Sequence, residues 1–319
     1  MAAVASRAGQ ESSTGFKSIV AGGLKALNRD KALHLMMLLP LAYFIVFCYV
    51  PMYGVTLAFK DFDSQGGILG SPWVGLKHFR TFFSDPYSYT LIRNTVLLRL
   101  WILALGFPAP IMLALLLNEI RQEGFKRFVQ SCSYLPHFIS MVVICGMIVS
   151  FVASDGPVNR IVEFFGGKPY AWLQRPEWFR PIYVLSGIWQ NAGWGSVLYL
   201  AALTAINPEL YEAAVIDGAG RWQRMHHITL PGIAPTATIM FLLSIGQMLT
   251  VGYTKVLLLY NGATYETADV LGTYVYRRGI QGADYGFATA VGLFQSLVGL
   301  VFIVASNRMA KKLGDTSLW

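Results

Sequence analysis

The sequence predicts an all-α membrane protein with six transmembrane helices, and three observations support this fold class. Of the 319 residues, 55% are hydrophobic and only 13% are charged, whereas soluble domains carry about 25% charged residues. Six apolar segments recur along the chain, and each supplies the roughly 20 residues that a helix needs to cross the hydrocarbon core. None of the six contains an aspartate or a glutamate, which also suits burial in lipid.

The chain begins with a segment of 32 residues that precedes the first apolar stretch. From Phe16 to Leu27, apolar residues recur at helical spacing, with Lys17 and Lys25 among them. This pattern predicts an amphipathic helix on the cytoplasmic membrane surface within residues 1–32. A short frayed extension is the alternative.

We expect a transmembrane domain over residues 33–307 and a cytoplasmic tail over 308–319. Glycines and serines in the fourth and sixth spans allow the close helix packing that membrane bundles need. The expected spans are 33–59, 90–117, 132–153, 182–205, 233–254 and 285–307.

The polar loop 206–232, between the fourth and fifth spans, carries the most information. From Asn207 onward it reads NPELYEAAVIDGAGRWQRMHHITLP. Asn207 is a favoured N-cap, and Pro208 suits the first helical position, where no intrahelical N–H is needed. Gly218 is a typical helix stop. The sequence therefore predicts a short helix over 208–217 that lies outside the hydrocarbon.

The spacing of residues in this loop resembles the cytoplasmic EAA loop of ABC importer permeases. In that family the loop forms a coupling helix that docks on the ATPase subunit. The resemblance implies a type I ABC importer permease core, with Glu212 anchoring the loop and Gly218 permitting its turn. An ordinary amphipathic surface helix is the alternative. The implied ATPase-coupling residues are Glu212, Ala213, Ala214, Asp217, Gly218, Ala219, Leu230 and Pro231.

A second signature lies upstream, at the start of the third span. Residues 134–140 read YLPHFIS and follow the Asn118-Glu119 pair and the basic Lys126-Arg127 pair. This arrangement is similar to permeases of the oligosaccharide and polysaccharide branch of the family, among them permeases of alginate importers. The resemblance covers nearly the whole chain from the first span onward.

The family resemblance also implies partners and a location. The assembly would contain a second homologous permease, two ATPase subunits, a periplasmic or extracellular solute-binding protein, and a saccharide cargo. ATP and Mg would be bound by the ATPase subunits, and this chain would hold no cofactor and no metal. The positive-inside bias is weak, but a docking loop must be cytoplasmic. We therefore expect a multi-pass protein of the cell (inner) membrane with both termini in the cytoplasm.

Three cations lie in or near the spans, and two of them, Arg99 and Lys255, are candidates for contact with cargo. A buried cation without an acidic partner costs a few kcal/mol even on insertion scales. Arg93 lies close enough to the outer boundary to snorkel, whereas Arg99 lies almost two turns deeper. We hypothesise that Arg99, with Lys255, faces the translocation cavity and favours an anionic sugar such as a uronate oligomer. An acidic residue of a partner permease would explain Arg99 equally well.

Other polar and aromatic residues of the spans are candidates for the same pathway, with interhelical hydrogen bonds and packing as the alternative. The candidate substrate-pathway residues are Arg99, Asn94, Trp189, Gln190, Asn191, Gln247, Tyr253, Lys255 and Gln295.

Other function classes fit the sequence less well. The chain has no Walker-type glycine loop and no HExxH or GxSxG motif, so we expect a non-catalytic subunit of an ATP-hydrolysing complex. The lack of acidic residues in the spans argues against an ion-coupled secondary transporter of sugars. An importer with a neutral sugar cargo remains a further alternative. The net charge of +8 is scattered among the spans, which fits anionic lipid headgroups better than nucleic acid.

Overall fold

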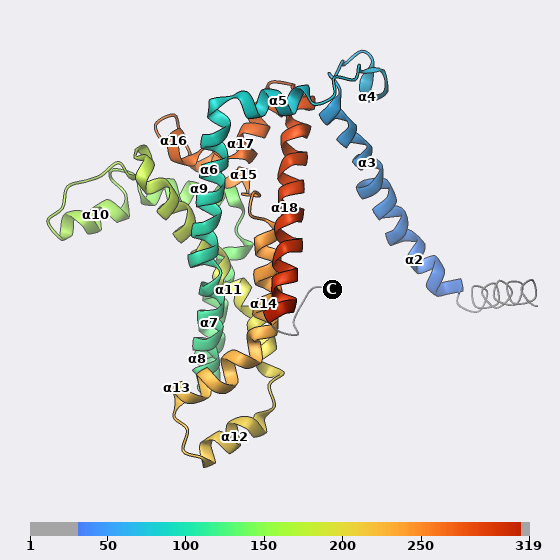
Figure 1. Cartoon of the computed structure of the whole chain (residues 1–319). Coiled ribbons are helices and arrows are strands. Elements are labelled where there is room, and N and C mark those ends of the chain that lie inside the picture. The colour runs from blue at the N-terminus through green and yellow to red at the C-terminus, as the bar shows by residue number, and fades with distance from the viewer. Residues whose placement is uncertain (1–30, 314–319) are drawn as a thin grey trace, which may run out of the picture. The chain divides into compact units, whose positions relative to one another are not determined.

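The computed structural model describes residues 31–313, which form helices joined by turns (Figure 1). The all-α class predicted from the sequence is confirmed for this range, where the one strand-like pairing is an isolated bridge between Lys60 and Trp73. The chain divides into two units, residues 1–56 and 57–319. The predicted N-terminal amphipathic helix lies outside the described residues.

The first unit contains one long apolar helix. It begins as α2 (Lys31–Phe44), widens into a π-helical turn (Ile45–Tyr49) and continues as α3 (Val50–Met52). A 3₁₀ segment (Tyr53–Phe59) completes it. The whole stretch Lys31–Phe59 is 29 residues long and apolar enough to cross a membrane, in agreement with the predicted first span.

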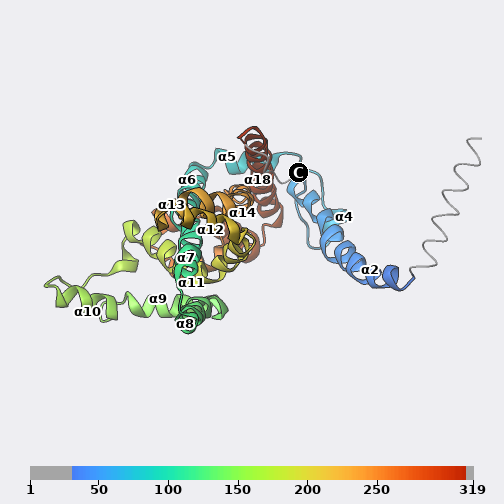
Figure 2. The same ribbon diagram turned by 90° about the horizontal axis from the view of Figure 1, so that it is seen from below.

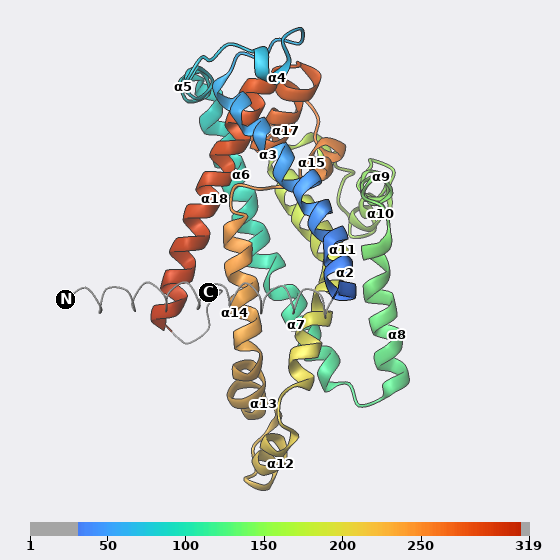
Figure 3. The same ribbon diagram turned by 90° about the vertical axis from the view of Figure 1, so that its right-hand side faces the viewer.

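The second unit is a helical bundle in which α11 is central. α11 packs against α7 and α14, and α14 packs against α18. Figure 3 shows these helices side by side, and Figure 2, which looks along the bundle from its α12 end, shows α18 and α8 on opposite sides of it. The long elements are α6 (Pro86–Trp101), a π-helical turn (Ile102–Gly106), α7 (Pro108–Glu119), α11 (Pro176–Thr204), α14 (Leu230–Gly246) and α18 (Tyr285–Leu313).

Shorter helices occupy the two ends of this bundle: α12 and α13 lie at one end, and α5 and α17 lie at the other (Figures 1 and 3). The shorter helices are α4 (Gly67–Gly70), α5 (Lys77–Ser84), α8 (Glu123–Tyr134), α9 (Met141–Phe151), α10 (Pro157–Phe164), α12 (Pro208–Ile216), α13 (Arg221–Arg224), α15 (Tyr253–Leu259), α16 (Tyr265–Ala268) and α17 (Leu271–Val275). 3₁₀ turns at Leu135–Phe138 and Trp172–Gln174 and π-helical turns at Met225–Thr229 and Tyr276–Gln281 complete the set.

Three buried apolar clusters hold the bundle together. One joins α6, α9, α11 and α15 through side chains such as Leu98, Ile144 and Val256. A second surrounds Phe82 and Phe287 near the α5 end, and a third lies between α7, α11 and α14 near the α12 end. The core therefore runs the length of the bundle and fixes the helices that carry the candidate site residues.

The predicted count of six spans is not confirmed. Within residues 31–313, four helices are long and apolar enough to cross a membrane, or five if a bent pair counts as one span. The four are Lys31–Phe59, Pro86–Glu119, Arg221–Gly246 and Tyr285–Lys312, and the pair is Glu123–Phe138 with Met141–Phe151, bent by 102°.

The differences from the predicted spans have local causes. α11 is 29 residues long, but Gln190, Asn191 and its glycines lower its hydropathy. The third span is interrupted where Pro136 enters a 3₁₀ turn and Ser140 caps a new helix. The fifth was expected to run to residue 254, but its helix ends at Gly246.

Candidate functional site

The predicted loop helix is present as α12, and its N-terminus is capped as the sequence indicated. Asn207 has extended backbone angles, and its Oδ1 accepts a hydrogen bond of 3.0 Å from the backbone N–H of Glu209. Asn207 Nδ2 donates to the Glu209 carboxylate at 3.1 Å. The cap and the acidic first turn both favour this helix terminus.

The C-terminus of α12 ends in a Schellman turn centred on Gly218, whose φ is +75°. The Ala219 N–H donates to the Ala214 carbonyl at 2.8 Å, and the Gly218 N–H donates to the Val215 carbonyl at 3.1 Å. This pair of bonds needs a left-handed residue at the position of Gly218. The glycine therefore sets the direction in which the chain leaves the helix.

The loop is closed at its base by contacts between its two arms. The Tyr211 hydroxyl lies 3.0 Å from Thr229 Oγ1, and Thr229 is 5% exposed. Gly232, directly after Leu230-Pro231, lies so close to Ile206 that a Cβ there would clash. These contacts tie α12 to the first turns of α14.

The outer face of the loop carries apolar side chains with little cover. Leu210 is 52% exposed, Ile216 is 86% exposed and Trp222 is 77% exposed. Glu212 and Ala213 are also exposed, whereas Tyr211 and Ala214 face the loop's own base. Of the predicted coupling residues, those from Glu212 to Ala219 lie on α12 and its C-terminal turn, whereas Leu230 and Pro231 form the first turn of α14.

Arg99 borders a cavity of about 450 Å³ in the bundle. One guanidinium nitrogen donates to the Ser244 carbonyl at 3.1 Å and to Gln247 Oε1 at 3.3 Å. Its Nε is buried without a hydrogen-bond partner, and no carboxylate in the described part of the chain pairs with it. The cavity is also lined by Ile102, Leu103, Gly106, Phe107, Pro110, Trp194, Gly195, Leu198, Tyr199 and Met240.

A second cavity, of about 260 Å³, adjoins the first across the π-helical turn Ile102–Gly106. Gln190, Asn191 and Lys255 all line it. The structure therefore brings three of the predicted pathway residues together here, and Arg99 lines the neighbouring cavity. Gln247 accepts a hydrogen bond from Arg99 but does not line that cavity.

The other predicted pathway residues lie elsewhere. Asn94 is fully buried and holds loops together, because its Nδ2 donates to the carbonyls of Glu266 and Asp269 at 2.9 and 3.1 Å. Gln295 Nε2 donates to the Leu249 carbonyl at 3.1 Å. Both side chains thus hydrogen-bond to neighbouring segments: Asn94 joins α6 to α16 and the residue after it, and Gln295 joins α18 to the turn after α14.

The two aromatic candidates also lie outside both cavities. Trp189 borders a separate apolar groove between α9, α10 and α11 with Phe151 and Leu185. Tyr253 is 44% exposed and stacks on Tyr276 with ring centroids 5.5 Å apart.

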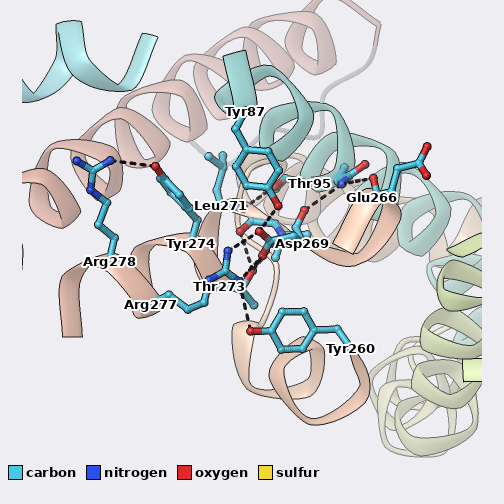
Figure 4. A network of polar contacts seen from close by, with 12 residues as sticks. Tyr87, Thr95, Tyr260, Glu266, Asp269, Leu271, Thr273, Tyr274, Arg277 and Arg278 are labelled. Carbon is cyan, nitrogen blue, oxygen red and sulfur yellow. Dashed lines mark hydrogen bonds and ion pairs between the residues drawn. The ribbon is translucent and has the colours of Figure 1, made fainter. Parts of the chain in front are cut away.

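Sequence reasoning missed a cluster of polar side chains around Asp269, which Figure 4 shows. This Asp269 cluster consists of Asp269, Tyr87, Thr273 and Arg277. Arg277 forms two bonds to the carboxylate at 2.6 and 2.8 Å, and the hydroxyls of Tyr87 and Thr273 each donate to it at 2.6 Å. The bonds to Asp269 raise the pKa of the Arg277 guanidinium above its ordinary value. The available signal was two acidic residues, Glu266 and Asp269, followed by two arginines in one loop.

The chain matches a known family over residues 106–315, described as the binding-protein-dependent transport system inner membrane component. It is 46% identical over 294 residues to the polygalacturonan/rhamnogalacturonan transport system permease protein YteP of Bacillus subtilis (strain 168), an alignment that covers 92% of each chain. It is 43% identical over 297 residues to the protein LplB of the same organism, with 93% of each chain covered.

Solved structures give the same result. A chain in the crystal structure of a bacterial ABC transporter involved in the import of the acidic polysaccharide alginate is 43% identical and superposes with a TM-score of 0.85. The match covers 91% of this chain and 99% of that one. The alginate transporter in complex with alginate pentasaccharide-bound periplasmic protein matches at the same identity and TM-score.

Proposed function

Because this chain belongs to the family of binding-protein-dependent transport system inner membrane components, we propose that it is the permease subunit of an ATP-driven importer of acidic oligo- or polysaccharides. The main support for an acidic cargo is the environment of Arg99. Its guanidinium borders a cavity of about 450 Å³ with no carboxylate partner among residues 31–313. An uncompensated cation inside a membrane protein is costly and marks a path for ions or substrates.

The relatives support an acidic cargo. Alginate is named as an acidic polysaccharide for the transporter of known structure, and polygalacturonan, named for the relative at 46% identity, is a polymer of uronate units. A carboxylate on each sugar unit offers the guanidinium a partner for charge-assisted hydrogen bonds. Neutral sugars offer the guanidinium only hydroxyl acceptors, which leave its charge without a counter-ion.

We further propose that α12 is the coupling helix of the permease. Its exposed apolar side chains (Leu210, Ile216 and Trp222) form a surface that suits a groove on an ATPase subunit. The rigid base formed by Tyr211 and Thr229 would pass a displacement of α12 on to α14. This role requires the loop in the cytoplasm, and with the six spans expected from the sequence both termini would lie there as well.

The assembly proposed for this chain follows from the same role. It contains a second homologous permease, two ATPase subunits that bind ATP and Mg, and a solute-binding protein on the outer side. The named complex of the alginate transporter with a loaded periplasmic protein supports the last of these partners.

Reconstitution in liposomes tests the proposed function. The chain is co-purified with these partners, and ATP hydrolysis is measured with the binding protein loaded with oligogalacturonate, oligomannuronate or a neutral oligosaccharide. We expect stimulation by the acidic sugars. Stimulation by neutral sugars alone would keep the importer and reject the acidic cargo, whereas uptake that follows an ion gradient without ATP would indicate a secondary transporter.

The role of α12 is tested by Gly218→Val. A β-branched residue at φ +75° costs about 1–3 kcal/mol of backbone strain, so the Schellman turn should rearrange and α12 should lose its direction. We expect sugar uptake per ATP hydrolysed to fall at least tenfold. The matched control is Gly220→Val, because Gly220 has φ −69° and ψ 170°, a conformation that valine adopts readily. Equal uptake by the two variants would reject the assignment.

A further inference from the structure

Lys255 is a buried cation whose surroundings do not balance its charge. The residue is 5% exposed, and its ammonium donates one hydrogen bond, of 2.9 Å, to the Tyr183 carbonyl. The nitrogen also lies 4.7 Å from the centre of the Tyr183 ring. No carboxylate within the described stretch 31–313 pairs with it. An ammonium has three donors and no acceptor, so at least one donor is free toward the second cavity.

Gln190 supplies an independent sign that this cavity takes a ligand. Its side chain is 5% exposed, and its Oε1 is buried with no hydrogen-bond partner. A buried acceptor without a donor costs about 1–3 kcal/mol, and such a cost persists in a native fold only where something offsets it. Gln190 and Lys255 line the same cavity. The Gln190 Oε1 itself is enclosed, so one molecule satisfies both side chains once the Gln190 amide turns toward the cavity.

The two side chains lack different binding partners, which a single ligand can supply together. Lys255 lacks an anion, and Gln190 Oε1 lacks a hydrogen-bond donor. A hexuronate carries a carboxylate and several hydroxyls on a single ring, which meets both needs. A neutral sugar offers hydroxyls to both side chains but no charge to Lys255, and an anion without hydroxyls, such as chloride, would satisfy Lys255 alone.

The size of the cavity limits the ligand to a small unit. Its volume of about 260 Å³ corresponds to roughly nine water molecules at about 30 Å³ each, which is room for one sugar ring. Gly187 helps to keep this room, because a Cβ there would lie 3.4 Å from the Lys255 nitrogen.

The two cavities follow one another along α11. The second is lined by residues from Tyr183 to Ala192, and the Arg99 cavity is lined by residues from Trp194 to Tyr199. At 1.5 Å per residue, their centres are about 13 Å apart along the helix. Ile102, Gly106 and Pro110 line both cavities, which are therefore adjacent. A saccharide chain that occupied both cavities would meet two cations in succession.

We propose that the Lys255–Gln190 cavity is a subsite for one hexuronate residue of the cargo, in which Lys255 binds the carboxylate and Gln190 turns its amide toward the cavity so that Oε1 accepts a hydrogen bond from a hydroxyl. This inference rests on the proposed function and deepens it. It assigns Lys255 and Gln190 as specificity-determining residues in addition to Arg99. It also predicts that discrimination of acidic from neutral units is made twice along the path.

The test compares trigalacturonate with its methyl ester, which has the same ring and hydroxyls but no charge. Direct binding of each sugar to the complete transporter in nanodiscs is measured by calorimetry, without the binding protein. The readout is the ratio of the two affinities. We expect the unaltered transporter to bind the acid at least tenfold more tightly than the ester.

Two variants probe the subsite in different ways. Lys255→Met keeps the bulk and removes the charge, so acid binding should fall at least tenfold while ester binding changes less than twofold. Gln190→Glu supplies an internal counter-ion for Lys255, repels the cargo carboxylate, and should reduce the affinity ratio to the same extent. Gln122→Glu adds the same charge at an exposed position between α7 and α8 and should leave the ratio unchanged.

The outcomes separate the two proposals. If the unaltered transporter shows no preference for the acid, the proposed acidic cargo fails together with the subsite. If it prefers the acid but both variants keep its ratio, the subsite alone is rejected. If acetate at equal carboxylate concentration displaces trigalacturonate, the cavity is a simple anion site and the sugar assignment is overturned.

Discussion

Two groups of buried charge in the second unit differ in how completely they are paired. The Asp269 cluster places a fully buried carboxylate against Arg277 and two hydroxyls. The two cavities along α11 instead hold Arg99 and Lys255 with carbonyl or amide acceptors and no carboxylate in the region that the structure describes.

The difference separates structural charges from charges kept for a ligand. A buried ion pair repays its desolvation only when geometry and hydrogen bonds are complete, and the Asp269 cluster meets that condition because it joins segments that must stay together. The cations at the cavities lie where space remains for another molecule. We infer that carboxylates of the cargo pair with these two cations during transport.

Loss of the carboxylate in the Asp269 cluster should produce the largest effect. Asp269→Asn leaves Arg277 without its counter-ion, and breaking a buried pair costs about 3–5 kcal/mol. We expect a loss of about 3 kcal/mol in the free energy of unfolding, at the lower end of this range, because the Arg277 side chain is 26% exposed. Thermal unfolding of the purified transporter, followed by size-exclusion fluorescence, measures the loss. Unchanged stability would show that the cluster is not structural.

The sequence predicts features that depend on contacts between residues close together in the chain, and it misses features that depend on contacts between distant residues. The cap at Asn207 and the stop at Gly218 were predicted correctly because both depend on neighbouring backbone groups. The Asp269 cluster was missed because Tyr87 and Asp269 are 182 positions apart. Asn94 was placed in the pathway by residue type alone, although its partners lie 172 and 175 positions away.

The count of six spans is not confirmed for a related reason. Hydropathy judges each segment alone, but a helix in the centre of a bundle contacts other helices more than lipid. α11 packs against α7, α8 and α14, and its polar residues line cavities instead of facing hydrocarbon. The polar residues Gln190 and Asn191, which lower the hydropathy of α11, are also the ones that line its cavity.

Removing the charge at the first cavity should give the next effect in size. Arg99→Gln keeps a hydrogen-bond donor for Ser244 but removes the cation, so stimulation of ATP hydrolysis by acidic cargo should fall at least tenfold, or by about 1.4 kcal/mol. Basal hydrolysis should stay within twofold. Both rates are measured in the reconstituted transporter.

The control for this variant is Arg93→Gln, which removes an exposed arginine from the same helix and should change neither rate by more than twofold. Equal losses of basal and stimulated hydrolysis in Arg99→Gln would reject a cargo role. That result would instead favour an ion pair between Arg99 and an acidic residue of the second permease.

The smallest effect is expected at a charge pair that is only partly buried. Arg278 and Asp284 lie 3.2 Å apart, and each side chain is 36% exposed. Asp284→Asn removes the charge but keeps an oxygen for the Phe287 N–H at the start of α18, since asparagine caps helices as well as aspartate does. Exposed pairs contribute about 0–1 kcal/mol, so the free energy of unfolding should fall by less than about 1 kcal/mol.

Because the substitution is chemically the same as Asp269→Asn, the ratio of the two losses of stability measures the effect of burial and of a complete hydrogen-bond network. Equal losses would mean that pairing, and not burial, sets the strength of these charges, and the contrast with the unpaired cations of the cavities would lose its physical basis.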